Sequence, residues 1–301
     1  MKHTFKVTIA LVLFFFLAQV TGLLVVNQYI DHKKTFETKR IEYKPLPYNL
    51  ERPEVKNQST SFLYIVISIL IGTMILLLII KTNKPIFWKI MFFISVLFTL
   101  TIAFSAFINE YIAGILALLI TILKMYKPNI IIQNFSEIFI YGGLAAFVVN
   151  IFNLFAVFML LILISIYDYI SVYKTRHMIK LANFQSKSKV FAGLFIPHNK
   201  GKISDRVGSA KPNKKIKFKR SAAVLGGGDI GFTLIFAGVV MKDLMLKEAV
   251  LTGFLKTLII PVLCSFALVT LLIKGQQNKF YPAMPILSLG CFVGYLIVLM
   301  I

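Results

Sequence analysis

Long apolar runs separated by short polar connections dominate the chain. A helix rises about 1.5 Å per residue, so roughly 20 apolar residues cross the ~30 Å hydrocarbon layer of a bilayer. The pattern therefore predicts an all-α polytopic membrane protein with nine transmembrane helices. Seven of them are expected at residues 7–26, 61–80, 86–108, 111–123, 221–241, 249–273 and 280–301, and two more within residues 130–173.

Two of these runs need interpretation. Residues 130–173 are too long for one helix, and the polar residues Asn150 and Asn153 mark the place where we divide them. Residues 111–123 are short for a full crossing and end before Lys124.

The N-terminal apolar run follows Lys2, His3 and Lys6 and resembles a signal peptide. The apolar part of such a peptide is about 7 to 15 residues long. Because residues 7–26 form a longer run, we interpret them as a retained span.

Charge predicts the orientation. The net charge is +21, and most Lys and Arg residues lie in the connections, where cytoplasmic retention of positive charge explains them better than nucleic-acid binding does. With the N-terminus inside, the inner connections hold 22 Lys and Arg and the outer ones 9. This asymmetry predicts a multi-pass protein of the cell membrane with a cytoplasmic N-terminus and an extracytoplasmic C-terminus. We expect no nucleic-acid partner.

The connections divide the chain into three parts. Residues 1–173 carry helices 1–6, with an extracytoplasmic connection at 31–60 that should be irregular or partly ordered against the spans. Residues 174–220 form a cytoplasmic basic loop with 14 Lys and Arg, and residues 221–301 carry helices 7–9. The loop suits a flexible linker that anchors the next span, with recognition of anionic lipid or acidic partners as the alternative.

Only three acidic residues fall within the predicted spans, namely Glu137, Asp168 and Asp229. Gln133 and Asn134 beside Glu137 indicate a hydrated span end. Asp168 precedes the cytoplasmic Lys174 by six residues, and Asp229 lies nine residues after the cytoplasmic Arg220. Helical rise then puts them roughly 9 Å and 13 Å from the same face of the membrane. A carboxylate at such depth is costly and indicates a functional site.

Two carboxylates that face each other at low dielectric cannot both ionise easily, so one keeps its proton. Such a pair supports peptide hydrolysis, because the ionised member can take a proton from water while the protonated member polarises the carbonyl. The alternative is a buried polar pair that only helps the helices to associate.

Two further segments stand out. Asp229 follows three glycines at 226–228, which allow close backbone approach. A phosphate-binding loop is a poor alternative, since no Gly-Lys-Ser/Thr follows. Residues 281–285 read Tyr-Pro-Ala-Met-Pro at the start of the last span, where prolines free backbone groups from helical bonding.

Taken together, these elements resemble a known family. Tyr167-Asp168, Gly226-x-Gly228-Asp229 and Pro282-Ala283-Met284 match, in order and spacing, the YD, GxGD and PAL motifs of the presenilin and signal-peptide-peptidase family of intramembrane aspartyl proteases. The resemblance covers the whole nine-span plan. The chain is most similar to the compact archaeal presenilin homologues. Methionine stands at 284 where the family has leucine, which conserves volume.

The resemblance implies a presenilin-like fold and an endopeptidase that cleaves single-span transmembrane proteins or peptides within the lipid bilayer. Asp168 and Asp229 would be the catalytic pair. The resemblance also implies no cofactor, no metal and no required accessory subunit. The residues that would shape the site or position substrate are Tyr167, Gly226, Gly228, Pro282, Ala283, Met284 and Pro285.

Three alternatives stay open. A cation- or proton-coupled transporter would also use membrane carboxylates, although no inverted repeat is visible. A prepilin-peptidase-like protease also carries a GxGD aspartate, but that family lacks the proline motif at 282–285. A structural membrane scaffold would tolerate asparagine at both aspartates. The two cysteines, Cys264 and Cys291, lie in apolar runs without metal-ligand spacing.

Overall fold

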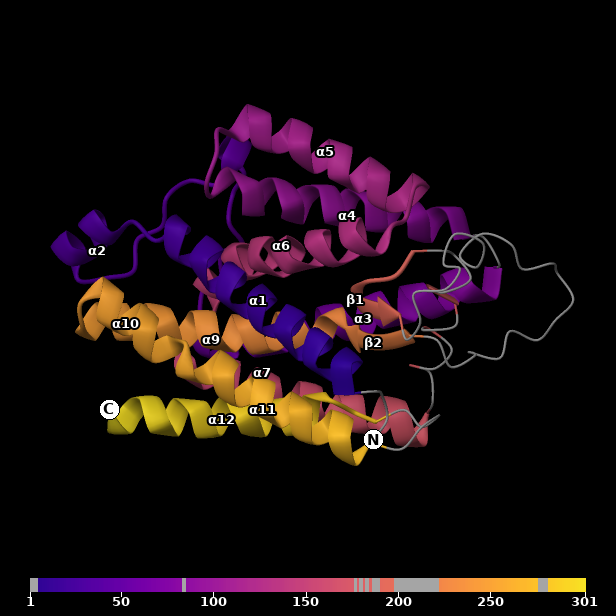
Figure 1. The fold of residues 1–301 in the computed structure, drawn as a ribbon. Helices are drawn as coiled ribbons and strands as arrows, with labels where there is room; N and C mark the ends of the chain where they lie inside the picture. Colours follow the sequence, from indigo (N-terminus) through magenta and orange to yellow (C-terminus); the bar gives the residue numbers. More distant parts are fainter. Residues whose placement is uncertain are drawn as a thin grey trace, which may run out of the picture.

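The computed structural model describes residues 5–82, 85–175, 178, 181, 184–185, 190–197, 222–275 and 281–301. Within these residues the chain folds into a helical bundle with one small β-hairpin (Figure 1). Most of the predicted basic loop at 174–220 lies outside the described residues.

The named elements of the first half of the chain are all helices or helical turns, because long apolar runs satisfy their backbone groups internally. Its elements are α1 (Phe5–Tyr29), α2 (His32–Thr38), the 3-10 turns η1 (Pro47–Asn49) and η2 (Gln58–Thr60), α3 (Ser61–Thr82), α4 (Pro85–Ser105), α5 (Glu110–Tyr126), α6 (Ile130–Val148) and the 3-10 turn η3 (Val149–Ile151).

The second half adds the hairpin. Its elements are α7 (Leu154–Tyr169), the π-helical turn η4 (Ile170–Lys174), β1 (Gly193–Pro197), β2 (Ala222–Gly226), α9 (Gly227–Lys247), α10 (Val250–Thr257), α11 (Ile259–Lys274) and α12 (Met284–Met300).

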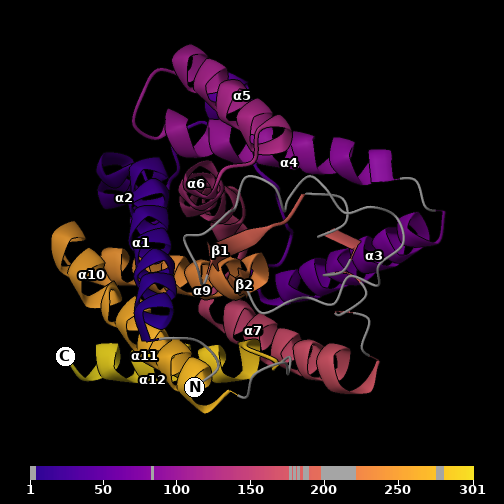
Figure 2. The ribbon, with the colours of Figure 1, turned by 45° about the vertical axis from the view of Figure 1, so that its right-hand side comes forward.

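The helices form a bundle with α4 and α5 on one side and α11 and α12 on the other (Figure 1, Figure 2). Between them, α1 packs against α6, α9 and α11, while α9 also contacts α6, α7 and α12. The main apolar core joins α1, α6, α7, α9, α11 and α12, and a smaller one lies between α4 and α5. Helix α9 is therefore central.

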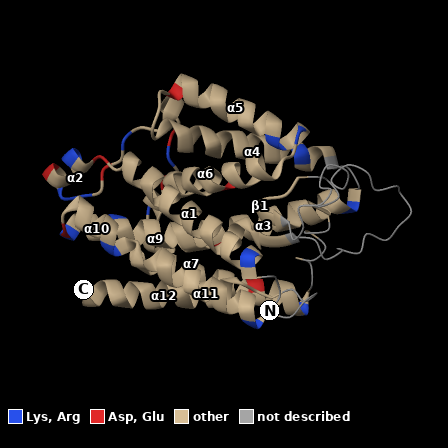
Figure 3. Cartoon of the chain, viewed as in Figure 1, with Lys and Arg blue, Asp and Glu red and all other residues tan. Residues whose placement is uncertain are grey.

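Six helical stretches in the described chain are long and apolar enough to cross a membrane: Phe5–Tyr29, Gln58–Thr82, Ile86–Ser105, Ile130–Ile151, Leu154–Lys174 and Val250–Lys274. Helix α12 is a shorter apolar helix. Charged residues gather near the ends of the helices, and the long faces between them are almost free of charge (Figure 3). The composition thus fits a multi-pass membrane protein.

The predicted break between helices 5 and 6 is present. Helix α6 gives way to η3 at Val149, and the Asn153 side chain caps α7 by accepting a hydrogen bond from the Ala156 N–H at 2.8 Å. An N-cap asparagine satisfies one of the free amides at a helix start. The sequence had therefore marked a real boundary.

The all-α prediction is wrong in one place. Residues 222–226, expected as the start of helix 7, form the strand β2, which pairs antiparallel with β1 from Gly193↔Gly226 to Pro197↔Ala222. The stretch between Ala222 and Gly226 is short and apolar, and periodicity alone cannot separate a buried strand from a helix start. As a result α9 begins only at Gly227.

Two other boundaries also differ from the prediction. Helix α5 continues through Lys124 to Tyr126. The run expected as helix 8 consists of α10 and α11, which meet at Leu258.

The connection at 31–60 is partly ordered against the spans, as expected. The Lys44 N–H donates a hydrogen bond to the Tyr29 carbonyl at 2.9 Å, and Arg52 Nη1 donates to the Ala146 carbonyl at 2.6 Å. The Arg52 guanidinium also lies over the rings of Tyr29 and Tyr43, 5.3 Å and 4.9 Å from their centroids. These contacts fasten the connection to one end of the bundle.

Candidate active site

Asp168 lies in the last turn of α7 and is buried, with 7% of its surface exposed. Its Oδ2 accepts a hydrogen bond of 3.1 Å from the backbone N–H of Met284, the first residue of α12. The amides of a first helical turn have no partner within their own helix. Asp168 therefore uses a free amide that the start of α12 supplies.

Asp229 is the third residue of α9, directly after the hairpin. The prediction of a position nine residues into a regular helix is wrong, because Ala222–Gly226 is strand. Asp229 is partly buried, and its carboxylate experiences Coulombic repulsion from Asp168. The two aspartates thus come together from the end of one helix and the start of another.

The three helices that carry these residues contact one another pairwise. Ser165 of α7 and Ser288 of α12 share a hydrogen bond of 2.8 Å between their hydroxyls. Phe158 of α7 meets Phe236 of α9 and Phe292 of α12, with ring centroids 5.0 Å apart in both pairs. These contacts hold α7, α9 and α12 in a fixed relation around the aspartates.

The start of α12 has the irregular backbone that its prolines predict. Residues 281–283 are not helical, and Pro285 lies in the first helical turn, where a missing N–H costs nothing. Pro282, Ala283 and Met284 are all buried. The segment therefore lies beside Asp168 inside the bundle.

Tyr167 points away from this group. Its hydroxyl lies 3.0 Å from the Thr73 hydroxyl of α3, a helix with no fully buried residue in its membrane-length window. Tyr167 thereby links α7 to an outer helix.

The glycines differ from one another in their surroundings. Within the described parts of the chain, a Cβ atom built on Gly228 would meet only Phe232, at 3.5 Å. On Gly226 it would lie 3.3 Å from Asp229 Oδ2. On Gly227, which the motif leaves unspecified, it would collide with the Tyr141 hydroxyl. The backbone of α9 therefore packs closely against Tyr141 at Gly227, and no such close contact is present at Gly228 among the described residues.

Glu137 is buried and paired, so its interpretation as a hydrated span end is wrong. Only 1% of Glu137 is exposed, and Lys124 Nζ lies 2.5 Å from its Oε1. Tyr141 donates its hydroxyl to the other oxygen, Oε2. A lysine and a glutamate in neighbouring apolar runs were the available signal for this pair.

A second buried side chain contacts the first turn of α9. Gln19 of α1 donates from Nε2 to the Ile230 carbonyl at 2.9 Å and to the Thr233 hydroxyl at 2.8 Å. Thr233 in turn donates to the Asp229 carbonyl at 2.8 Å. The sequence analysis did not single out Gln19 or Thr233, since an isolated polar residue in an apolar run carries no pattern.

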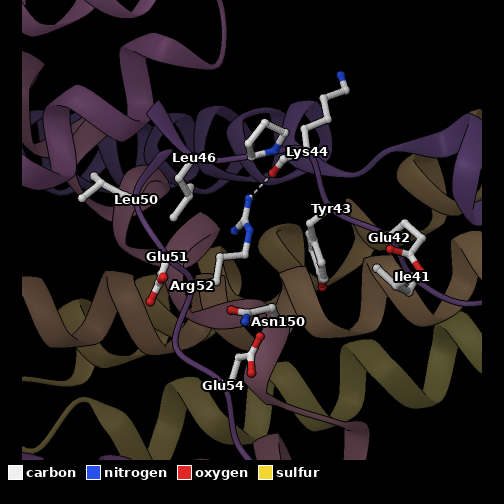
Figure 4. Close-up of a pocket in the computed structure, with 11 residues that line it drawn as sticks. Ile41, Glu42, Tyr43, Lys44, Leu46, Leu50, Glu51, Arg52, Glu54 and Asn150 are labelled. Carbon is white, nitrogen blue, oxygen red and sulfur yellow. Dashed lines mark hydrogen bonds between the residues drawn. The ribbon is translucent and has the colours of Figure 1, made fainter. Parts of the chain in front are cut away.

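An open pocket of about 760 Å³ lies away from the aspartates, at the connection between residues 41 and 54 and beside Asn150 (Figure 4). Asn150 precedes α7 and Asp168 ends it, so the length of that helix, roughly 24 Å, separates the two. Arg52 within the pocket is held by carbonyls, and burial lowers the pKa of its guanidinium. We do not assign chemistry to this pocket.

Among the described residues, no group of three or more His, Cys, Asp or Glu side chains is arranged to hold a metal ion. Cys264 and Cys291 are both buried, with their sulfurs 3.3 Å apart between α11 and α12.

A membrane bundle that brings two carboxylates together from neighbouring helices has the arrangement of an aspartic protease that works inside the bilayer. The family model described as "Signal-peptide peptidase, presenilin aspartyl protease" matches residues 43–301. The match spans most of the chain, and the chain belongs to this family. It is an integral, multi-pass membrane protein and an aspartic-type intramembrane endopeptidase.

Solved structures of the same fold support this assignment. Two are described as a presenilin family intramembrane aspartate protease, one in a P2 and one in a C222 space group. The first shares 18% identity with a TM-score of 0.59 and covers 97% of this chain and 96% of its own. The second shares 19% identity with a TM-score of 0.61 and covers 97% and 98%. No curated protein matches the sequence.

The resemblance inferred from the three motifs is thereby confirmed at the level of the family and the fold. The family match does not favour the transporter or the prepilin-peptidase alternative.

Proposed function

We propose that Asp168 and Asp229 form the catalytic dyad that hydrolyses peptide bonds within transmembrane helices of substrate proteins. The observation that carries this proposal is the convergence of both aspartates and the 282–284 segment at the ends of α7, α9 and α12. One carboxylate takes a proton from a water molecule as its oxygen attacks the carbonyl carbon. The other carboxyl group, protonated, donates a hydrogen bond to the carbonyl oxygen.

The tetrahedral intermediate then collapses. The C–N bond breaks, and the departing nitrogen receives a proton from the dyad, which returns to its starting state with one carboxyl protonated. Water and the two carboxyl groups supply all the atoms and protons required, so the reaction needs no cofactor.

We further propose that the substrate binds as an extended strand near the dyad. A transmembrane helix hides its peptide bonds in its own hydrogen bonds, so part of it must unwind and find new partners. In the described chain β1 and β2 form a two-stranded sheet, and the outer edge of β2 has no neighbouring strand. Gly226, Gly228 and the 282–285 segment would shape the site around this strand.

The family relation supports substrates that are single-span transmembrane proteins or peptides, and we propose that the chain cleaves them without accessory subunits. The test is to reconstitute the purified protein in liposomes with a single-span test substrate. Fragments should appear with the wild-type protein and be missing with Asp168→Asn and with Asp229→Asn. Fragments from either variant would refute the dyad, and a lack of cleavage by the pure wild-type protein would refute independence from accessory subunits.

We also propose a nine-span topology in which α1, α3, α4, α5, α6, α7, α9, α10 with α11, and α12 cross the membrane. The N-terminus and residues 174–220 would lie in the cytoplasm and the C-terminus outside. Because Cys264 and Cys291 are buried, single exposed cysteines can report the orientation. In intact cells a membrane-impermeant maleimide should label Lys39→Cys, and should label Lys127→Cys only after permeabilisation. The reverse labelling would invert the topology.

A further inference from the structure

A buried ionic cluster lies between α5 and α6, beside the start of α9. Lys124 of α5 and Glu137 of α6 form an ion pair of 2.5 Å, and their side chains are 2% and 1% exposed. Lys124 Nζ also donates to the Ser136 hydroxyl at 2.8 Å. Glu137 has two further donors, since Gln133 Nε2 lies 2.9 Å from its Oε1 and the Tyr141 hydroxyl donates to its Oε2.

Tyr141 connects this cluster to the start of α9. Its ring lies against Gly227, where an added Cβ would be 3.0 Å from both Cε1 and Cζ, and against Gly231, where an added Cβ would be 3.7 Å from Cδ1. Residues four apart lie on the same face of a helix. The two glycines therefore form a shallow groove on α9 that holds the ring, and Asp229, two residues after Gly227, lies close enough to interact electrostatically with Tyr141.

The same cluster reaches the hairpin. Gln133 Nε2 donates to the carbonyls of Phe191 and Gly193, both at 3.0 Å. The neighbouring residue Asn134 makes two bonds of 2.9 Å with the backbone of Phe195 in β1. Since β2 continues directly into α9, α6 holds the hairpin and the first turn of α9 together.

We propose that Tyr141 is a positioning residue for Asp229: its hydroxyl, anchored by the Glu137–Lys124 pair, fixes its ring in the Gly227–Gly231 groove and so sets the rotation of the first turn of α9. This proposal rests on the proposed dyad. Misplacing a reacting group by about 1 Å can cost on the order of a hundredfold in rate. A tyrosine that acts through helix position should therefore affect the chemical step more than substrate binding.

The first test compares Tyr141→Phe with Tyr29→Phe. Tyr29 is a matched control, because it is also a buried tyrosine whose hydroxyl donates one hydrogen bond, to the Ile102 carbonyl at 2.8 Å, far from the aspartates. With the single-span substrate in liposomes, Tyr141→Phe should lower kcat about tenfold and leave KM unchanged. Tyr29→Phe should change neither.

A second readout separates positioning from stability. A peptide-like inhibitor with a hydroxyl in place of the scissile bond mimics the tetrahedral intermediate and needs both carboxyl groups in place. Its affinity should fall with kcat in Tyr141→Phe, while the affinity for uncleaved substrate and the melting temperature in detergent stay close to wild type. A fall in melting temperature with unchanged kcat per folded molecule would show that Tyr141 is only structural.

The groove itself provides a third test. Gly227→Ala should push the ring out and lower kcat on the order of a hundredfold, and Tyr141→Leu should act similarly. If both act on the same helix position, the double variant should be at least as active as Gly227→Ala alone, because leucine leaves room for the new methyl group. Gly72→Ala, where an added Cβ meets nothing within 4 Å, is the glycine control. Losses that multiply in the double variant would overturn the proposal.

The failure of this proposal is distinguishable from failure of the dyad. If Asp168→Asn and Asp229→Asn are inactive and Tyr141→Phe has wild-type kcat, the dyad stands and the positioning role is wrong. If either aspartate variant cleaves substrate, the proposed function itself is wrong.

Discussion

Two acidic sites in the same bundle have opposite surroundings. Glu137 has a buried cation, a buried tyrosine donor and a partly buried glutamine donor around it. For Asp168 and Asp229, no Lys or Arg in the described parts of the chain forms an ion pair with either carboxylate. Their charged neighbour is each other. Both sites are costly to bury, but within the described residues only the first has an opposite charge beside it.

This difference separates structure from chemistry. A buried carboxylate with a full set of partners has no free lone pair or proton to offer a substrate, whereas a poorly compensated pair retains both. The position of a carboxylate deep within an apolar run does not distinguish a structural carboxylate from a catalytic one. The partners do, and they come from other helices.

The largest expected effect comes from the uncompensated pair. Asp168→Ala and Asp229→Ala should each lower proteolysis by at least about a thousandfold while the protein stays folded, because one carboxyl group cannot both activate water and polarise the carbonyl. Cleavage of the single-span substrate, normalised to folded protein by gel filtration in detergent, measures this. Substantial activity in either variant would mean that these aspartates are not catalytic and do not differ in role from Glu137.

Breaking the compensated pair should lower the stability of the fold, in addition to loosening the anchor of Tyr141. Lys124→Met leaves Glu137 buried without its cation and should cost about 3–5 kcal/mol of unfolding free energy. Adding Glu137→Gln removes the stranded charge, so the double variant should recover much of that loss. Thermal unfolding in detergent provides the measurement. Equal stability of Lys124→Met and wild type would mean that the ion pair does not hold α5 to α6.

Variants beside the dyad should lower turnover moderately. Pro282→Leu allows the irregular start of α12 to become regular helix, and Gly228→Leu fills open space next to Asp229. Each should reduce cleavage of a stably helical substrate about tenfold without unfolding the protein. A helix-breaking residue near the scissile bond should partly restore the rate. If both variants cleave at the wild-type rate, Gly228 and Pro282 do not position the substrate.

The rate should depend on pH as a bell. At low pH both aspartates are protonated and no base remains, and at high pH both are ionised and no proton polarises the carbonyl. The two apparent pKa values therefore belong to the pair. In Glu137→Gln the bell shape should persist, because this glutamate does not take part in proton transfer. Loss of one limb in that variant would place Glu137 in the reaction.

The smallest expected effect is that of a chelator. Two carboxyl groups and water account for the proposed reaction, so EDTA at millimolar concentration should leave the rate of cleavage unchanged. Inactivation that added divalent metal reverses would contradict a dyad mechanism.

Much of the fold was predictable because the length of each apolar run and the polar residues that interrupt it can be read locally in the sequence. The boundary at Asn153 is one example, since a side-chain cap stops a helix wherever it occurs. The strand β2 was not predictable, because five apolar residues fit either a strand or the first turns of a helix. Its partner, β1, lies on the far side of the 198–221 segment, and only pairing decides between the two.

The candidate site shows the same division. The motif residues were recognisable because their types and order are unusual in apolar runs. Glu137 was misread, since its polar neighbours Gln133 and Asn134 look like solvent contacts in the sequence. In the structure they bind the hairpin backbone. A single sequence does not specify which of its polar side chains meet across helices.

The sequence by itself determined that this chain enters a membrane and which acidic residues lie within its apolar runs, because hydrophobicity and residue type act position by position. It also determined the family through its three motifs. The tertiary structure alone decided that Gly227 packs closely against Tyr141 and that Glu137 pairs with a buried lysine, whereas neither Asp168 nor Asp229 has an ion pair with Lys or Arg among the described residues. These outcomes depend on which helices meet, and burial costs are offset only by groups that the fold brings within a few ångströms.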